Sequence, residues 1–298
     1  MGKRIKTCPI CGNTEVEYTK TKISDFVKAR IGCDDIDISL VHCTKCSFAF
    51  YDYRFSPEEE KKLYNLYRDN NYQKQREKYE CWYTEKVNTA LNNDKKYLKE
   101  QQKIIAKILK DNGYNYFENA LDFGGNKGAT FIERWGTKNK YSFDISQSEV
   151  LPNITKINNI EELYTLKLDF VMCNMTFEHL ANPTEIIDIF TRIGNQNTIF
   201  YVEVPSEFPF NFNKFSIFNN ISLLFNPNFN KWRLFKYYLK TKNEPFLTMK
   251  EHINFYTQKS LRTLVNNFNF RIIDVQENYE NAALGKCKVL SILFSKQN

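Results

Sequence analysis

The chain has 298 residues, of which 42% are apolar, enough for one large domain with a sizeable core and a small additional module. Its net charge of +7 permits an anionic substrate without requiring nucleic acid. No apolar run reaches the roughly 18 residues of a membrane helix, and the N-terminus has no apolar signal-peptide region. We therefore expect a cytoplasmic protein without a membrane span, whose eight cysteines are thiols or metal ligands rather than disulfides.

Two Cys-x-x-Cys pairs open the chain, the first at Cys8 and Cys11 and the second at Cys43 and Cys46. In such a turn both sulfur atoms point the same way, and two turns supply the four thiolates of a tetrahedral Zn²⁺ site. Gly12 relieves the first turn. Because four sulfur ligands leave no open position, the sequence predicts a structural zinc site rather than a catalytic one.

Short strand-like runs surround these cysteines, at residues 15–19, 36–42 and 48–51. Together they predict a zinc-binding ribbon over residues 1–55. The stretch between the cysteine pairs is acidic or neutral, which argues against a phosphate-binding face.

Residues 56–118 are expected to form a helical, tyrosine-rich connecting segment. Ser56 has the features of a helix N-cap, with proline and acidic residues following it. Residues 88–112 have the clearest helical periodicity. Three roles remain open for the aromatic residues of this segment, which are packing on a core, lining a pocket or stacking on bases: Tyr64, Tyr67, Tyr72, Tyr79, Trp82 and Tyr83.

A glycine-rich turn at residues 124–128 follows an apolar strand that ends at Phe123. Glycine in such a turn allows close approach of a ligand and unusual φ angles. Asp122 lies at the end of this strand, and Asp144 lies at the end of the next apolar run. An acidic residue at that second position is where a ribose diol is held in nucleotide-binding folds.

The remainder of the chain alternates between strands and helices, which predicts an open, mostly parallel α/β sheet of seven strands. Expected elements are strands near residues 154–157, 168–174, 198–204, 270–275 and 288–294, with helices starting at Asn182 and Thr257. Residues 206–250 break this rhythm, and we interpret them as an aromatic lid or substrate-binding insertion.

These motifs resemble class I S-adenosylmethionine-dependent methyltransferases over roughly residues 90–298. The resemblance is closest to sugar C-methyltransferases of deoxysugar pathways, in which a four-cysteine zinc domain precedes the methyltransferase fold. Asn126 carries much of it, because that branch has asparagine at the centre of the glycine turn. The tyrosine-rich segment and the Glu251-His252 pair occupy matching places.

The resemblance implies a Rossmann-like S-adenosylmethionine-binding domain over residues 119–298. The cofactor-binding residues that it implies are Asp122, Gly124, Gly125, Asn126, Gly128, Asp144, Asn174 and Met175. Asp144 would hold the ribose, and Asn174 and Met175 would border the methionine end.

His252 is the expected general base, since imidazole is suited to proton transfer near neutral pH. Glu251 is expected to orient it, and Tyr72 to form a hydrogen bond with the substrate. His179, which follows Glu178, is interpreted as structural or adjacent to the cofactor.

The expected acceptor is a small molecule or glycan, such as a nucleotide-linked sugar, methylated at carbon or oxygen. Two departures from the sugar enzymes bear on this expectation, namely the absence of their further C-terminal α/β domain and the insertion at residues 206–250. Three alternatives remain, which are an RNA-directed methyltransferase or RNA-binding protein, a small-metabolite O- or N-methyltransferase, and a binding protein without turnover.

Overall fold

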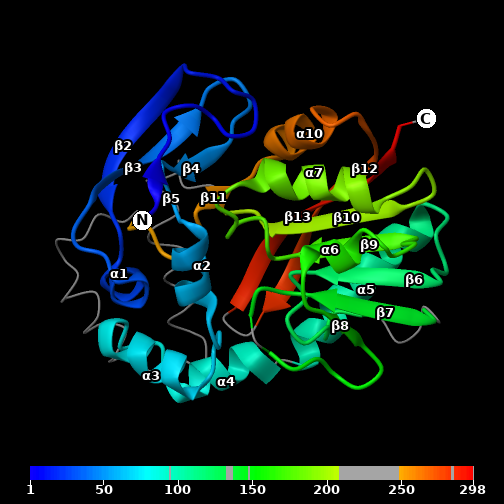
Figure 1. Cartoon of the computed structure of the whole chain (residues 1–298), viewed down its shortest axis with the longest axis horizontal. Helices are drawn as coiled ribbons and strands as arrows, with labels where there is room; N and C mark the ends of the chain where they lie inside the picture. Colours follow the sequence, from blue (N-terminus) through cyan, green and yellow to red (C-terminus); the bar gives the residue numbers. More distant parts are fainter. Residues whose placement is uncertain (94, 132–136, 147, 208–247, 283–284, 298) are drawn as a thin grey trace.

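The computed structural model in Figure 1 describes residues 1–298 apart from 94, 132–136, 147, 208–247, 283–284 and 298. It contains a seven-stranded sheet, a four-stranded sheet and a two-stranded sheet. In Figure 1 the N-terminal strands form one lobe, and the larger sheet with its helices forms the other.

The larger sheet has the spatial order β12-β13-β10-β9-β6-β7-β8. Neighbours from β10 to β8 pair in parallel, whereas β13 is antiparallel to both of its neighbours. This arrangement confirms the expected mostly parallel α/β methyltransferase sheet. Its strands are β6 (Asn119–Phe123), β7 (Asn139–Phe143), β8 (Thr155–Ile157), β9 (Phe170–Asn174), β10 (Ile199–Pro205), β12 (Phe270–Ala282) and β13 (Gly285–Lys296).

The chain order reverses at β6, because β7 lies on one side of it and β9 on the other. In open α/β sheets, such a reversal leaves a crevice outside the carboxyl ends of the two central strands. The glycine turn follows β6 directly. The topology therefore places this turn at the position where ligands bind in this class of fold.

Both faces of the sheet are covered, as the near-continuous apolar strand β9 requires. Phe170 and Met172 pack in one core with α5, while Val171 and Cys173 face a second core that contains side chains of α7 and α10. Alternate side chains of one strand thus enter opposite cores. The helices are α5 (Lys95–Asp111), α6 (Ile160–Leu163), α7 (Pro183–Ile193) and α10 (Gln258–Asn266).

The four-stranded sheet combines residues from both ends of the chain, in the order β11-β4-β3-β2. Three of its strands come from the N-terminal region, namely β2 (Val16–Lys22), β3 (Asp37–Cys43) and β4 (Ala49–Tyr51). The fourth, β11 (Asn254–Phe255), comes after β10 of the larger sheet in sequence and pairs with β4. A parallel bridge between Ile23 and Met249 adds a second connection. The chain around Glu251 and His252 is therefore held by the N-terminal sheet.

The remaining N-terminal elements surround a separate core of aromatic and aliphatic side chains. α2 begins as expected, because Ser56 and Glu59 form a capping box. These elements are β1 (Lys3–Arg4), β5 (Tyr53–Arg54), α1 (Asp25–Ile31), α2 (Pro57–Tyr64), α3 (Asn70–Tyr79) and α4 (Glu85–Asn93).

The expected helix over residues 88–112 differs from the structure. Two helices, α4 and α5, occupy this region on either side of residue 94, and α4 starts earlier, at Glu85. The apolar periodicity located the helical region but not its division. The expected insertion at residues 206–250 lies mostly outside the described residues. Among the described residues, no helix is long and apolar enough to cross a membrane.

Candidate active site

The glycine turn requires glycine at two positions for both conformational and steric reasons. Gly124 has φ of +75°, and a Cβ there would lie 2.4 Å from Oγ1 of Thr176. Gly128 has φ of +74°, and a Cβ there would lie 2.5 Å from Cδ1 of Ile154. Left-handed backbone is unfavourable for residues with a Cβ. The turn therefore packs its backbone closely against the residue just before β8 and the segment just after β9.

Gly125 is needed for a different reason, since its φ is not positive. A Cβ there would lie 2.3 Å from the carboxyl carbon of Asp122, which is 1% exposed. Burial, followed by the charge of Asp144, raises the pKa of Asp122 to about 8. The buried Asp122 side chain therefore packs directly against the backbone of Gly125 in the turn.

Asp144 is held by two backbone N–H groups. The N–H of Asn126 donates to Oδ2 at 2.9 Å, and the N–H of Ser146 donates to Oδ1 at 2.7 Å. Each carboxylate oxygen can accept a further hydrogen bond. The side chain is therefore fixed in orientation while both oxygens keep capacity for a ligand.

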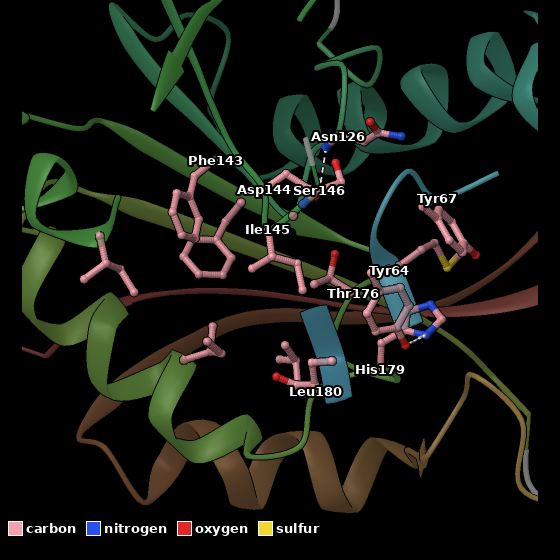
Figure 2. A pocket seen from close by; sticks show the side chains of 16 residues that line it. Tyr64, Tyr67, Asn126, Phe143, Asp144, Ile145, Ser146, Thr176, His179 and Leu180 are labelled. Carbon is pink, nitrogen blue, oxygen red and sulfur yellow. Dashed lines mark hydrogen bonds between the residues drawn. The ribbon is translucent and has the colours of Figure 1, made fainter. Parts of the chain in front are cut away.

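A cavity of ≈ 290 Å³ lies beside this turn, as Figure 2 shows. Tyr64 at the end of α2 and Tyr67 in the following turn form one wall, so the N-terminal region closes the cavity. Aliphatic and aromatic side chains dominate the lining, which suits a flat, partly apolar ligand. The lining residues are Glu60, Tyr64, Tyr67, Phe123, Gly124, Asn126, Phe143, Asp144, Ile145, Ser146, Ile160, Met175, Thr176, His179, Leu180 and Ile186.

Four of the eight expected cofactor residues line this cavity: Gly124, Asn126, Asp144 and Met175. Near the carboxyl ends of β6 and β9, three buried acceptor atoms have no hydrogen-bond partner among the described residues, namely Oδ2 of Asp122, Oδ1 of Asn126 and Oδ1 of Asn174. Of these three residues, Asn126 lines the cavity. Buried acceptors of this kind are costly unless a donor reaches them. A ligand that carries hydroxyl and ammonium donors fits this arrangement.

Two histidines from segments far apart in the sequence, His179 and His252, lie against each other beside the cavity. The ring centroids of His179 and His252 are 4.7 Å apart, with an interplanar angle of 80°. His179 lines the cavity and follows β9, whereas His252 lies just before β11. The sequence identified His252 as a site residue, but it gave no sign that His179 would be its neighbour.

The environment of His179 favours a neutral ring. Nδ1 lies 3.0 Å from the carbonyl oxygen of Glu251, so it carries the proton and donates, which leaves the lone pair on Nε2. The hydroxyl of Tyr64 lies 3.1 Å from the same nitrogen. Burial, and then the charge of His252, lowers the pKa of His179 to about 3.

His252 has the opposite electrostatic environment. Its Nδ1 lies 2.8 Å from Oε2 of Glu207. Burial lowers the pKa of His252, but the Glu207 carboxylate outweighs this effect and raises the pKa to about 9. Glu207, just beyond β10, was not identified from the sequence.

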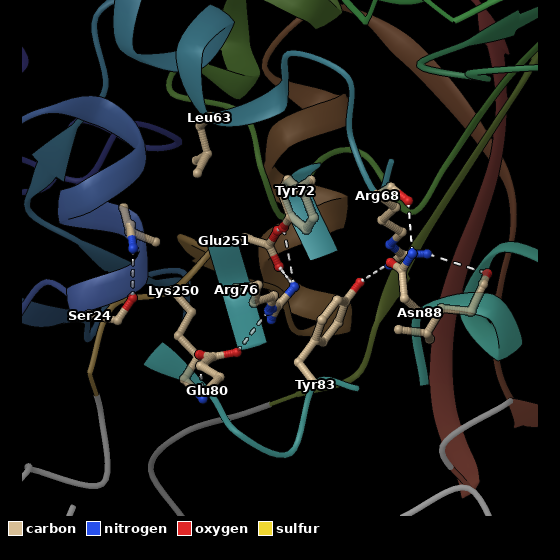
Figure 3. A network of polar contacts seen from close by, with 12 residues as sticks. Ser24, Leu63, Arg68, Tyr72, Arg76, Glu80, Tyr83, Asn88, Lys250 and Glu251 are labelled. Atoms are coloured by element: carbon tan, nitrogen blue, oxygen red, sulfur yellow. Dashed lines mark hydrogen bonds and ion pairs between the residues drawn. The ribbon is translucent and has the colours of Figure 1, made fainter. Parts of the chain in front are cut away.

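Glu251 occupies a different network from the one expected. Its carboxylate accepts hydrogen bonds from the Tyr72 hydroxyl and, at 2.8 Å, from Nη1 of Arg76 (Figure 3). These contacts outweigh burial and lower the pKa of Glu251 to about 2. Tyr72 is fully buried. The structure thus gives His252 the partner Glu207 instead of Glu251, and it places Tyr72 in a buried network on α3.

The four cysteines of the two Cys-x-x-Cys pairs form one cluster, with their sulfur atoms all within 4.8 Å of one another. The sulfurs of Cys8 and Cys46 are 3.6 Å apart, and those of Cys11 and Cys43 are 3.5 Å apart. Tetrahedral Zn–S bonds of about 2.3 Å require sulfur separations of roughly 3.8 Å. The cluster therefore fits a metal ion of this size.

Comparisons with known proteins agree with this fold. The sequence profile of a family described as "Methyltransferase domain" matches residues 72–275. No curated protein matches the chain. One similar solved structure is magnesium protoporphyrin IX methyltransferase from Synechocystis PCC 6803 with bound SAH, at 11% identity over 80% of this chain and 100% of that chain, with a TM-score of 0.49. A SAM-dependent methyltransferase from Anabaena variabilis ATCC 29413 matches at 12% identity over 71% of this chain and 92% of that chain, with a TM-score of 0.44. Another from Clostridium acetobutylicum ATCC 824 matches at 12% identity over 71% of this chain and 97% of that chain, with a TM-score of 0.43.

The matched segment covers more than half of the chain and contains the glycine turn, Asp144 and both site histidines. The chain therefore belongs to the methyltransferase-domain family and is a class I S-adenosylmethionine-dependent methyltransferase.

Proposed function

We propose that S-adenosylmethionine binds in the cavity beside the glycine turn, with its ribose on Asp144 and its methionine end toward Asn174 and Met175. The Asp144 carboxylate and the unpartnered Oδ1 of Asn126, which both line the cavity, carry this assignment, because the ribose hydroxyls bring donors that these oxygens can accept. Phe143 and Ile145 offer apolar surface to the adenine. S-adenosylmethionine supplies an activated methyl group when bound, which leaves the protein to position the acceptor and to move a proton.

We propose His252 as the general base, held by Glu207. A carboxylate on one ring nitrogen fixes the tautomer and the orientation of an imidazole, and leaves the other nitrogen for proton transfer. The pKa of about 9 makes this ring a stronger base than an ordinary histidine. Neutral His179 would accept a hydrogen bond from the acceptor through Nε2.

We propose that the acceptor is a sugar, either nucleotide-linked or part of a glycan, methylated at carbon or oxygen. Support comes from the combination of a four-cysteine module with a histidine pair beside the cofactor cavity. Carbon methylation next to a keto group requires a base for a weakly acidic C–H, and a base of raised pKa suits that task. The same pair also suits removal of a hydroxyl proton.

We propose that the four cysteines bind one structural Zn²⁺. Their sulfur separations support it. Cys43 ends β3, Cys46 lies in the turn between β3 and β4, and Cys8 and Cys11 lie in the loop before β2. The metal would keep the loops at the end of the four-stranded sheet in place.

The acceptor is tested with S-adenosylmethionine labelled in its methyl group. The protein is incubated with nucleotide-linked sugars that carry or lack a keto group, with glycan fragments, and with RNA. Mass spectrometry then locates the label. Label on a sugar supports the proposal, and its position distinguishes carbon from oxygen methylation. Label on RNA alone, or on a small metabolite alone, would contradict it.

A further inference from the structure

The two histidines lie on short connecting segments rather than on long regular elements. His179 lies between β9 and α7, and His252 lies between a lone bridge residue, Met249, and the two-residue strand β11. Such segments adopt a defined conformation only when other groups satisfy their backbone. The relative position of the rings therefore depends on what binds these two segments together.

Arg54, in the N-terminal strand β5, contacts both of these segments. Its Nε donates to the carbonyl oxygen of Ala181 at 2.7 Å, and its Nη2 donates to that of Leu180 at 2.7 Å. Nη2 also donates to Oδ1 of Asn254 at 2.8 Å. One planar group thus binds the residues immediately after His179 and the side chain two residues after His252.

Asn254 completes this connection from the other side. Its Nδ2 donates to the carbonyl oxygens of Phe177 and Leu180, at 2.8 and 2.7 Å. The N–H groups of Ile253 and Asn254 both donate to the carbonyl oxygen of Glu178. The Arg54 guanidinium and the Asn254 amide therefore fix the backbone on both sides of His179 relative to the chain that carries His252.

The chemistry of Arg54 is unusual for a residue that serves stability alone. It is 3% exposed, and the hydrogen bonds that it donates end on uncharged oxygen atoms. The Glu60 carboxylate interacts with Arg54 electrostatically, but no hydrogen bond joins the two among the described contacts. Burying a cation costs free energy, and apolar side chains of similar volume are often as stabilising. Only the rigid fork of a guanidinium reaches several carbonyl groups in fixed directions.

We propose that Arg54 is a positioning residue for methyl transfer. Through it, the four-cysteine module, which is the N-terminal region of residues 1–55, sets the distance and angle between the rings of His179 and His252. This role rests on the proposed function of the histidine pair. It makes the N-terminal module a part of the active site. Since misplacement of catalytic groups by about 1 Å costs on the order of 10²-fold in rate, loss of this residue should lower kcat strongly and leave S-adenosylmethionine affinity within about 3-fold.

The test compares Arg54→Gln and Arg54→Lys with Arg4→Gln, a matched control in the same module whose side chain is 49% exposed. Calorimetry gives the affinity for S-adenosylmethionine, and turnover of the acceptor that the labelling experiment identifies gives kcat. Imidazole ¹⁵N NMR spectra give a third readout, because the chain has only 3 histidines.

We expect Arg54→Gln to lower kcat about 100-fold and to shift the titrations of both His179 and His252 toward that of an ordinary histidine. Arg54→Lys should retain more of the wild-type kcat than Arg54→Gln does. Arg4→Gln should change neither kcat nor the titrations of His179 and His252. Asn254→Ala keeps Arg54 and removes the hydrogen bonds from the Asn254 amide to Phe177 and Leu180. It should shift the titrations of His179 and His252, and it provides the test if Arg54→Gln fails to fold.

Unchanged titrations of His179 and His252 in folded Arg54→Gln, or in Asn254→Ala where Arg54→Gln does not fold, would overturn the positioning role. That failure is distinct from failure of the proposed function. If His252→Asn turns over at the wild-type rate, the histidine pair is not the proton-transfer site, whatever Arg54 does to its spectra.

Discussion

Replacing Glu207 with glutamine tests the electrostatic environment of His252. The carboxylate lies 2.8 Å from Nδ1 of His252, and it raises the pKa of that ring from its ordinary value of 6.5 to about 9 despite burial. Because the Glu207 side chain is 48% exposed, solvent screens part of this interaction. We therefore expect Glu207→Gln to lower the pKa of His252 by about one unit, or ~1.4 kcal/mol.

The assay is a pH titration of the three imidazole rings by ¹⁵N NMR, with each ring assigned by its own His→Asn variant. A matched control is Glu17→Gln, since Oε2 of Glu17 lies 3.2 Å from Nδ1 of the distant His42. Glu207→Gln should lower the midpoint of His252, and Glu17→Gln should leave the midpoint of His252 unchanged. An unchanged His252 midpoint in Glu207→Gln would refute the assignment of Glu207 as its partner.

The same pairing sets the direction of two pH effects. A base must be neutral to accept a proton, so kcat should rise as the pH increases toward about 9 and level off above it. The folded-state pKa of His252 is raised above its unfolded value, so the pairing stabilises the fold fully below about pH 6.5 and is lost as the pH rises through about 9. Glu207→Gln should shift both effects to lower pH.

Three further predictions concern the cofactor and the metal. Asp144→Asn should weaken S-adenosylmethionine binding about 10-fold or more, because hydrogen bonds to charged groups contribute roughly 1.5–3 kcal/mol; calorimetry checks this, with Asp169→Asn at the other end of the sheet as a control expected to bind normally. Gly124→Ala should abolish binding, because its Cβ would clash with Thr176, and wild-type affinity in this variant would contradict the cavity assignment. Native mass spectrometry should find one Zn²⁺ per chain, Cys8→Ser should lose it and melt at lower temperature, and a metal-free wild-type protein would refute the zinc proposal.

Local sequence patterns were sufficient to predict much of the fold. The Cys-x-x-Cys pairs, the glycine turn and the capping residues each act within a few positions. The expected strands before residue 206 agree with the observed ones within about two residues at most ends, whereas β12 and β13 extend well beyond the expected ranges 270–275 and 288–294. β9 was recognisable because a strand buried on both faces must be apolar throughout. The turn at residues 124–128 lies where its glycines indicate.

The arrangement of the site could not be predicted in the same way, because it depends on contacts between distant parts of the chain. His179 meets His252 only because β11 joins the N-terminal sheet. Glu251 was expected to orient its neighbour His252, yet its side chain binds Arg76 of α3. Consecutive residues outside helices often point in different directions, so adjacency in sequence did not predict contact in space.

Tyr64 and Arg54 illustrate the same limit. Tyr64 belongs to a segment for which packing, pocket lining and base stacking were all open. Its place in the cavity wall follows from its contacts with His179 and with the carbonyl oxygen of Glu251. Arg54 carries no sequence motif. Its role depends on three oxygen acceptors more than a hundred residues away, which only the folded chain brings together.

The most direct test of the proposed mechanism is the turnover of His252→Asn on the methylated sugar, measured beside His42→Asn and together with S-adenosylmethionine affinity. The account predicts that His252→Asn binds S-adenosylmethionine normally and loses about 10²-fold or more in kcat, whereas His42→Asn retains full activity. Equal turnover by His252→Asn and the wild-type protein would contradict it.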